Sequence, residues 1–398
     1  MEQETYMKYV ADQNYERFLE QGYATAGHNG PHGHKDTPVR NTAHYLIIYS
    51  YLYKVTGNEK YKVICCKFSD YLYEMQQSSV SGAIQCMVTD QFDHLNGLIG
   101  QGWVIEGLLY HYEVFRDERS LETAKKIFFT QKYDWKEHLW HRIELDGTDI
   151  GVDPTYNHHV WFAACSCKLA YFLNDSTIDD MITDFLTKGA DRDFRIYLEG
   201  LLRHHINTSY SSRQKNRLKG VIKVCLTPVK SLSPKKFDRK YMEHAYHVFD
   251  LYGFTILKER YPNLPLFSSS KYQKAVIYAK DVETFTRNCG AYDAIEQGDM
   301  FNVYSYSYNC PAFEYPYVAE QCGFDSAEMY EQQFELLVKL MYNKQTKMFT
   351  RNNPDIETWN ARTYEIIRYL DCLHGNQKCA DDMNTEQKST NQQIKAGV

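Results

Sequence analysis

The feature that most constrains the fold is a repeated unit of two helices joined by a very short turn. Apolar residues recur at helical spacing along nearly the whole chain, whereas the alternation typical of strands is scarce. Short turns with an Asn or Asp that can cap the following helix lie at Asn58, Asp117, Asp175 and Asp325. Two helices joined by so short a turn form an antiparallel hairpin. The sequence therefore predicts an all-α chain built of helical hairpins.

The spacing of these turns favours a closed ring. The first three lie 59 and 58 residues apart, and the last gap of 150 residues leaves room for another hairpin and for an insertion near 190–238. Five hairpins are then complete, and the first and last helices are left to form a sixth, whereas an open solenoid would need polar caps at both ends. We expect a single (α/α)6 toroid domain over 1–380 and a disordered polar tail over 381–398. The expected helices span 5–21, 39–56, 59–76, 97–116, 118–131, 157–173, 176–188, 239–260, 268–286, 313–322, 326–342 and 358–373.

Composition narrows the classes of partner. The net charge of −6 argues against a nucleic-acid binder, because no positive field draws a phosphate backbone. No apolar run approaches the roughly 20 residues of a membrane span, so we expect no membrane insertion. The 34 Tyr residues suit wet, half-apolar surfaces such as those that sugars offer. The 11 Cys include no CxxC pair and no signal peptide is visible, which favours a cytoplasmic protein with reduced thiols.

The long loops precede every second helix, so in a ring they would all lie on one face. Long loops on a rigid scaffold commonly carry function. These loops, and the helix starts that follow them, are rich in His, Trp and Tyr as well as in Asp, Asn and Thr. Helix capping accounts for Asp, Asn and Thr but not for the imidazole and aromatic side chains. We therefore expect the functional site on this face.

Four segments carry a resemblance to a known family. Residues 29–44 (with TPVRNTAH), 93–108 (DHLNGLIGQGWVIEGL), 156–164 (YNHHVWFAA) and 359–365 (WNARTYE) resemble the six-hairpin, (α/α)6-barrel glycosidase-like superfamily. Members of this kind are often encoded in surface-polysaccharide biosynthesis clusters. The resemblance implies a ring of six inner and six outer helices with a sugar-binding cleft at one end. Related toroids include unsaturated glucuronyl hydrolases, N-acylglucosamine epimerases and uronate epimerases, and no catalytic motif of any one group matches this chain.

The first functional hypothesis is a glycoside hydrolase acting on an oligosaccharide, such as one containing a uronic acid. Glycoside hydrolysis requires two carboxyl groups beside the scissile bond, one of them with a raised pKa. Asp93, beside a Gly-rich helix start, and Glu314, in a Tyr- and Pro-rich segment, are the first candidates. Asp90 and Asp153 come next.

Two other hypotheses stay open. An epimerase or lyase would use a His or Tyr acid–base pair, with His158 as its first candidate and Arg40 or Arg362 holding a uronate carboxylate. A non-catalytic glycan-binding protein of polysaccharide biosynthesis would use the same surface. For all three, the expected substrate-binding residues are Arg40, Asn41, His44, His94, Gln101, Trp103, Asn157, Trp161, His247, Tyr308, Trp359 and Arg362.

Two groups of residues contain side chains that can bind a metal ion. His28, His32, His34 and Asp36 lie close together in a Gly- and Pro-containing loop, and 243–247 carries a Glu and two His. Neither group has the spacing of an H-E-x-x-H or another diagnostic metal motif. We expect no metal and no cofactor, and the sequence leaves the oligomeric state open.

Overall fold

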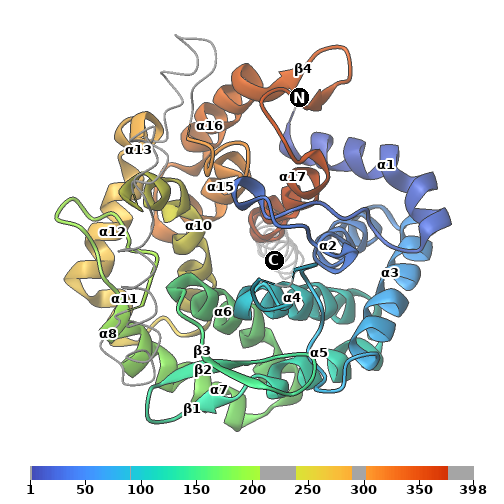
Figure 1. Cartoon of the computed structure of the whole chain (residues 1–398). Helices are drawn as coiled ribbons and strands as arrows, with labels where there is room; N and C mark the ends of the chain where they lie inside the picture. Colours follow the sequence, from blue (N-terminus) through green and yellow to red (C-terminus); the bar gives the residue numbers. More distant parts are fainter. Residues whose placement is uncertain (1, 90, 207–238, 289–301, 375–398) are drawn as a thin grey trace, which may run out of the picture.

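The computed structural model describes residues 2–89, 91–206, 239–288 and 302–374, and they form a ring of helices around a central axis (Figure 1). Each inner helix packs against the next around the ring, and the last packs against the first, which closes it. The last inner helix continues through a short 3-10 turn, Thr363–Ile366, into a further helical stretch over 367–374. Among the described residues, the inner helices are α2 (Pro38–Thr56), α4 (Gly97–Phe115), α6 (Tyr156–Leu173), α10 (Arg239–Arg260), α15 (Pro311–Cys322) and α17 (Ile356–Arg362).

A second layer of helices surrounds the inner ring and pairs with it hairpin by hairpin. This layer consists of α1 (Gln3–Gln21), α3 (Glu59–Gln77), α5 (Glu118–Thr130), α7 (Ser176–Asp184) with its π-helical extension Phe185–Ala190 and the short α8 (Asp191–Asp193), the group α11 (Pro265–Ser268), α12 (Ser270–Lys280) and α13 (Val282–Asn288), and α16 (Ser326–Met341). The expected toroid fold is confirmed.

The short turns act as the sequence predicts. The side chains of Asn58, Asp117, Asp175 and Asp325 each accept a hydrogen bond from a backbone N–H in the first turn of the following helix. Each cap satisfies one of the amide groups that a helix start leaves unpaired. Because the preceding helix ends only two or three residues earlier, the chain must reverse there, which produces the hairpins.

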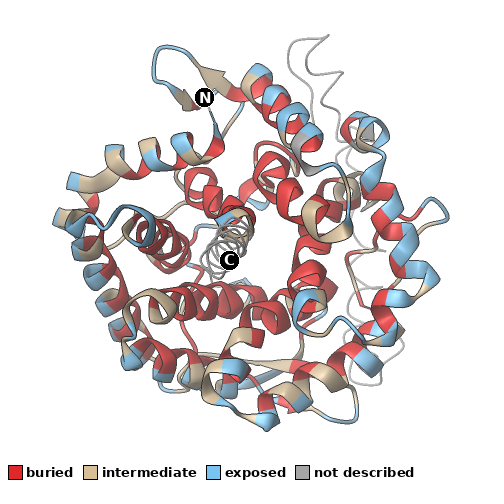
Figure 2. Ribbon diagram, turned by 180° about the vertical axis from the view of Figure 1, so that it is seen from behind, coloured by how far each residue is buried: buried red, intermediate tan, exposed pale blue. Residues whose placement is uncertain are grey.

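Burial separates the two layers. Seen from behind, the inner helices are buried almost throughout, whereas the outer helices expose one side (Figure 2). In α4, every described residue from Gly97 to His111 is buried. A helix that is apolar on all sides is typical of a position between other elements. The core therefore lies between and within the two rings, and the ends of the inner helices remain free to build a site.

The ring is closed by contacts between α1 and α17. The Tyr6 hydroxyl donates a hydrogen bond to the Asn360 side chain at 2.8 Å, and both residues are buried. Arg17 forms an ion pair with Glu357 at 2.8 Å. The first and last segments thus form the sixth pair, as the hairpin count predicts.

Several elements differ from the sequence-based expectation. Three short antiparallel strands precede α6: β1 (Tyr133–Asp134), β2 (Leu139–Ile143) and β3 (Asp149–Val152), while β4 (Tyr342–Asn343) pairs with β5 (Met348–Phe349). They are too short for an alternating pattern to stand out from the helical background. The single helix expected over 268–286 is interrupted, with breaks at Ser269 and Asp281.

The predicted insertion is described in part. Residues 194–206 fold back onto the start of α6 through a β-bridge between Thr155 and His205, so this part reaches the site rather than forming a separate surface excursion. Residues 207–238 and the polar tail over 381–398 lie outside the described residues. Within the described ranges, no helix combines the length and apolar character needed to cross a bilayer.

Candidate functional site

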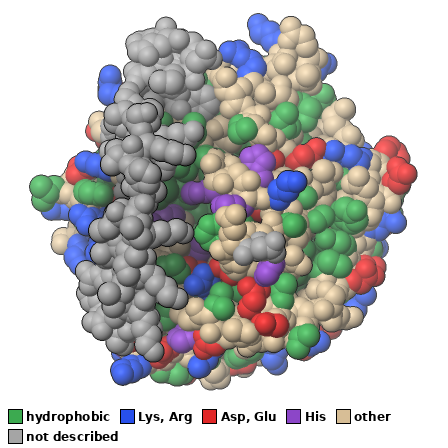
Figure 3. All heavy atoms as spheres, viewed as in Figure 1, with side chains coloured by type: hydrophobic (Ala, Val, Ile, Leu, Met, Phe, Trp, Pro, Cys, Tyr) green, Lys and Arg blue, Asp and Glu red, His purple; other side chains and the backbone are tan. Residues whose placement is uncertain are grey.

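A cavity of about 380 Å³ opens at the end of the ring where the inner helices begin. Its lining comes from the loops before α2, α4, α6 and α15 and from the first turns of α4, α6 and α10. Strand β2, the segment that ends at residue 206, and Arg362 of α17 complete it. The predicted face of the ring therefore carries the cavity, and Figure 3 shows His side chains around its hollowed centre. A volume of this size is typical of small-molecule sites.

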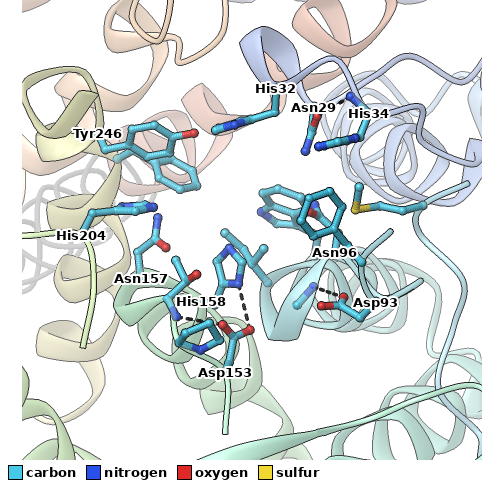
Figure 4. A pocket seen from close by; sticks show the side chains of 18 of the residues that line it. Asn29, His32, His34, Asp93, Asn96, Asp153, Asn157, His158, His204 and Tyr246 are labelled. Atoms are coloured by element: carbon cyan, nitrogen blue, oxygen red, sulfur yellow. Dashed lines mark hydrogen bonds and ion pairs between the residues drawn. The ribbon is translucent and has the colours of Figure 1, made fainter. Parts of the chain in front are cut away.

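The lining combines imidazole, aromatic and carboxylate groups. Figure 4 shows Asp153 and His158 on one side, with His204, Asn157 and Tyr246 beside them and His32, His34 and Asn29 opposite. Apart from Ile99, Pro154, two Met and a Gly, the residues are polar or aromatic: Asn29, His32, His34, Phe92, Asp93, Asn96, Trp103, Arg142, Asp153, Thr155, Asn157, His158, His204, His205, Tyr246, Phe249, Tyr308, Asn309 and Arg362. Such a lining offers both hydrogen bonds and apolar faces to a ligand.

Asp153 and His158 form a carboxylate–imidazole pair at the start of α6. The Nδ1 atom of His158 lies 2.9 Å from the Oδ2 atom of Asp153. Burial alone would raise the pKa of Asp153, but the hydrogen-bonded His158 and the nearby Arg142 hold it well below its usual value. The ionised carboxylate can only accept, so Nδ1 of His158 carries the proton and Nε2 is left as the proton acceptor.

The position of Asp153 is itself fixed by its surroundings. Its Oδ2 atom accepts the backbone N–H of Leu98 at 3.0 Å, and Oδ1 accepts that of Thr155 at 2.9 Å. The backbone carbonyl of Asp153 accepts a hydrogen bond from Nε2 of the buried His159 at 2.9 Å. Burial lowers the pKa of His159 to about 4, so this second imidazole is neutral and structural.

Gly97 allows the pair to sit against the first turn of α4. Its φ is +61°, in the left-handed region. A Cβ atom at this position would overlap the imidazole of His158 and the carboxylate of Asp153. Glycine is therefore required both by the backbone conformation and by the close approach.

Asp93 and Arg142 form a second charged pair in the cavity wall. The Nη1 atom of Arg142 donates to Oδ2 of Asp93 at 2.7 Å, and Oδ1 of Asp93 accepts the backbone N–H of Gly97 at 2.7 Å. Arg142 reaches the cavity from β2, an element that the sequence reasoning did not predict. Asp93 thus anchors both β2 and the start of α4.

A group of buried polar side chains stands beside the Asp153–His158 pair. His204 lies with its Nδ1 atom 3.9 Å from Oδ2 of Asp250 and its ring 4.5 Å from that of Tyr246. Burial raises the pKa of Asp250, and hydrogen bonds from His204 and Asn157 offset this in part. Burial and the nearby His204 lower the pKa of His32, so this imidazole is neutral at pH 7.

The first candidate metal group is divided by the fold. His32 and His34 line the cavity, whereas His28 contacts the Gly30 carbonyl and Asp36 pairs with Arg40. Among the described residues, no three His, Cys, Asp or Glu side chains are grouped so that they could hold a metal ion.

Glu314, the second of the two leading carboxylate candidates, lies outside the cavity. It is fully buried, and its Oε1 atom accepts hydrogen bonds from Arg362 at 2.9 Å and from the Cys310 amide at 3.1 Å. Burial, together with the neighbouring Glu365, raises the pKa of Glu314 well above its ordinary value. Glu314 is therefore out of reach of a ligand in the cavity, and this position does not support it as the catalytic acid.

Arg362 and Arg40 are placed differently from the predicted carboxylate clamp. Arg362 lines the cavity, but its guanidinium donates to Glu365, Glu314, Asn309 and the Tyr308 carbonyl. These bonds use all five of its N–H groups. Arg40 is buried beneath the cavity and pairs with Asp36 at 3.2 Å.

Most other predicted binding residues are structural. Trp161 and Trp359 are fully buried and donate their indole N–H groups to the carbonyls of Phe249 and Tyr306. His94 is half-exposed and faces Glu144. The other residues are buried and form contacts within the ring: Asn41 bonds to Thr25, Gln101 bonds to Ile84, His44 stacks on Tyr364, and His247 bonds to Leu202 and Ala275. The sequence shows that these residues start inner helices, but not which side of the helix faces the axis.

The structure therefore brings seven of the predicted residues to the cavity. They are Asp93, Trp103, Asp153, Asn157, His158, Tyr308 and Arg362. Asp90 lies outside the described residues. Sequence reasoning did not select Asn29, Phe92, Asn96, Arg142, His204, His205, Tyr246 or Phe249, although Asn29, Phe92, Asn96 and Tyr246 fall within segments that it marked as functional.

Comparison with known structures agrees with the ring. Cellobiose 2-epimerase from Spirochaeta thermophila superposes with a TM-score of 0.61 over 93% of this chain and 98% of its own, at 12% identity. Unsaturated glucuronyl hydrolase from Bacillus sp. GL1 gives a TM-score of 0.59 over 94% and 97%, also at 12% identity. The chain therefore has the (α/α)6 toroid fold of these structures. At this identity the likeness concerns the toroid itself, and the two enzymes differ in reaction.

A curated protein is also similar to this chain in sequence. Archaeal glycosylation protein Q of Haloferax volcanii is 27% identical over 366 residues, which cover 88% of this chain and 92% of that protein. No family model matches the chain.

Proposed function

We propose that this six-hairpin toroid is a carbohydrate-active enzyme. Three lines support the proposal. The two solved structures described above are named as sugar-processing enzymes, the relative in Haloferax volcanii is named as a glycosylation protein, and the cavity combines polar groups with aromatic faces. The last point matters most, because a fold of this kind hosts several reactions.

The reaction that the geometry supports best is epimerisation or isomerisation of a sugar by proton transfer next to a carbonyl group. The observation that carries it is the Asp153–His158 pair, in which Nδ1 of His158 is held by the carboxylate at 2.9 Å. A carboxylate that orients an imidazole in this way leaves Nε2 as a general base. His204, which also lines the cavity, supplies an imidazole group for the return of the proton.

Glycoside hydrolysis is less well supported by the same geometry. In the described part of the cavity wall, the carboxylates are Asp93 and Asp153. Both oxygens of each accept hydrogen bonds from protein N–H groups, which leaves neither set up to hold the proton that a general acid must donate. Glu314, Asp36 and Asp250 have raised pKa values, but they are buried and do not line the cavity.

Proton NMR in deuterated water tests the proposal. The purified protein is incubated with D-mannose, D-glucuronate, N-acetyl-D-mannosamine and cellobiose, and we expect loss of the proton signal next to the carbonyl carbon of at least one sugar. New reducing-end anomeric signals would instead indicate hydrolysis, a new vinylic signal would indicate a lyase, and line broadening without product would indicate binding alone.

The His158→Gln variant makes the test specific. We expect it to abolish the exchange, because no general base remains at this position. His141→Gln is the matched control, since His141 pairs with Asp149 at 2.8 Å on β2 and does not line the cavity. Full exchange in the His158→Gln variant would refute the assignment of the base.

A further inference from the structure

Two buried guanidinium groups lie against aromatic rings that line the cavity. The Cζ atom of Arg40 is 4.3 Å from the centroid of the Trp103 ring and 5.9 Å from that of Tyr308. The Cζ atom of Arg362 is 4.8 Å from the Phe249 ring and 5.6 Å from that of Tyr308. We call Trp103, Tyr308 and Phe249 the cation-backed rings. All three line the cavity, whereas Arg40 is 1% exposed and lies behind them.

Both guanidinium groups keep their charge. Burial opposes the charged form of Arg40, but Tyr308 and Asp36 outweigh it and raise its pKa. The neighbouring carboxylates likewise outweigh burial for Arg362. The buried His44 next to them is neutral, because burial and the two cations lower its pKa. At pH 7 the charge behind the rings is therefore that of the two guanidinium groups, because His44 adds none and neither Arg loses its proton.

The counter-ions do not reach the cavity. Asp36 bonds only one nitrogen of Arg40, at 3.2 Å, and the Nε and Nη2 atoms of Arg40 have no protein partner. Glu365 and Glu314 hold Arg362 from the core. Neither Asp36, Glu314 nor Glu365 lines the cavity. The charges in contact with the cation-backed rings are therefore positive.

A cation on one face of an aromatic ring draws electron density towards itself. The opposite face then attracts negative charge more strongly and positive charge less strongly. Glycoside hydrolysis passes through a positively charged, oxocarbenium-like state. Removal of a proton next to a carbonyl group instead produces a planar anion, and charge that develops in the reaction is best stabilised by fixed groups of opposite sign.

We propose that Arg40 and Arg362, acting through the cation-backed rings, stabilise an enediolate formed on the bound sugar. This rests on the proposed function and names its substrate class, an open-chain aldose or ketose. Nε2 of His158 takes the proton from the carbon next to the carbonyl carbon, the C–H electron pair forms the new carbon–carbon double bond, and the carbonyl electron pair moves onto oxygen. Return of a proton to the other face of that carbon, as the oxygen electron pair re-forms the carbonyl group, restores a neutral sugar. Return of the proton to the former carbonyl carbon also requires the neighbouring hydroxyl proton to move to the former carbonyl oxygen, which leaves the carbonyl group on the neighbouring carbon. Arg40 does not touch the substrate and is a positioning residue.

Three probes of different charge test this at pH 9.5 by calorimetry. D-arabinonohydroxamate, ionised at this pH, is a planar anionic mimic of the enediolate, the quaternary N,N-dimethyl salt of 1-deoxynojirimycin is a cationic mimic of the oxocarbenium state, and D-arabinitol is neutral. We expect the wild-type protein to prefer the hydroxamate to the other two. Equal or tighter binding of deoxynojirimycin, or no preference of the hydroxamate over arabinitol, would overturn the proposal.

Two variants separate charge from shape. The double variant Asp36→Asn/Arg40→Met removes the ion pair without leaving a buried charge alone. It should bind the hydroxamate severalfold more weakly, because the cation that lies against the rings is lost while its partner Asp36 does not line the cavity, with arabinitol binding unchanged. Asp36→Asn alone removes only the counter-ion and should bind the hydroxamate more tightly. A merely structural role of Arg40 would weaken all probes alike and would not produce opposite signs.

The outcomes also separate this inference from the proposed function. If the double variant fails to fold, the Asp36→Asn variant tests the inference. Unchanged or weaker binding of the hydroxamate by Asp36→Asn would overturn it. Loss of exchange in His158→Gln together with equal hydroxamate binding in all Arg40 and Asp36 variants would leave the proposed function standing and remove the inference. A hydroxamate preference without exchange on any sugar would contradict the proposed function while the preference for an anion remains.

Discussion

The Oδ2 atom of Asp153 lies 2.9 Å from Nδ1 of His158 and 3.0 Å from the backbone nitrogen of Leu98. One carboxylate oxygen therefore links the candidate base on α6 to the first turn of α4. The orientation of the imidazole depends on how these two neighbouring inner helices pack. This link makes the site sensitive to changes in either helix.

Asp153→Asn should inactivate the enzyme without emptying the cavity. An amide can donate where the carboxylate accepts, which favours the wrong tautomer of His158. We expect kcat for deuterium exchange to fall about a hundredfold or more, with a much smaller change in KM. If kcat stayed unchanged and only KM rose, Asp153 would contribute to substrate binding and not to the orientation of His158.

Asp153 should also contribute to stability in a pH-dependent way. Its pKa is held well below the usual value in the folded state, while in the unfolded chain it is about 3.9. The stabilisation is therefore fully present above about pH 4 and is lost as the pH falls below that value. Urea unfolding at pH 7 and pH 3 should show a larger loss for the wild type than for Asp153→Asn, and equal losses would contradict the assignment.

Gly97→Ala should damage both stability and activity. The new methyl group overlaps His158 and Asp153, and the φ of +61° adds strain for any other residue. Gly147→Ala is a matched control, because Gly147 has a φ of +89° and open space around its Cβ position. We expect the control to lose about 1 kcal/mol of unfolding free energy and no activity. Similar activity in the two variants would mean that the close approach at Gly97 does not hold the base.

Glu314→Gln should be tolerated. Burial and Glu365 raise the pKa of the wild-type side chain well above the ordinary value, which favours its neutral form, and Gln keeps its size. We expect at least half of the exchange activity and a thermal midpoint within a few degrees of the wild type. Complete loss of turnover in a folded variant would restore Glu314 as a candidate acid.

Tyr6→Phe tests the closure of the ring. The buried Tyr6 hydroxyl donates to Asn360 at 2.8 Å and accepts the Phe349 amide at 3.1 Å. Its removal leaves two buried groups unpaired and should cost about 1–3 kcal/mol in urea unfolding. Tyr9→Phe loses only an exposed bond of 3.4 Å to the Thr346 carbonyl and should cost little. Equal small losses would show that α1 does not hold the ring closed.

The ring and about half of the site could be predicted from the sequence, because both depend on local features of the chain. Caps such as Asp117 and helix starts such as Asp153 and His158 are local features, and they remain recognisable without the fold. Arg142 and His204 could not be predicted in this way, since a short hairpin and a returning loop bring them to the cavity. Glu314 was misplaced because an inner helix is apolar on both sides, so its sequence does not show which side faces the axis.

The pairing of α1 with α17 has a kinetic consequence. These helices lie more than 300 residues apart in the chain, as the 354-residue separation of Tyr6 and Asn360 shows. Contacts of such long range require a large loop to close before they gain energy, which slows folding. During synthesis, α1 must wait for almost the whole chain to emerge, with its apolar side uncovered. Because Arg362 follows directly after this closing contact, the floor of the cavity is completed only in the last step of assembly.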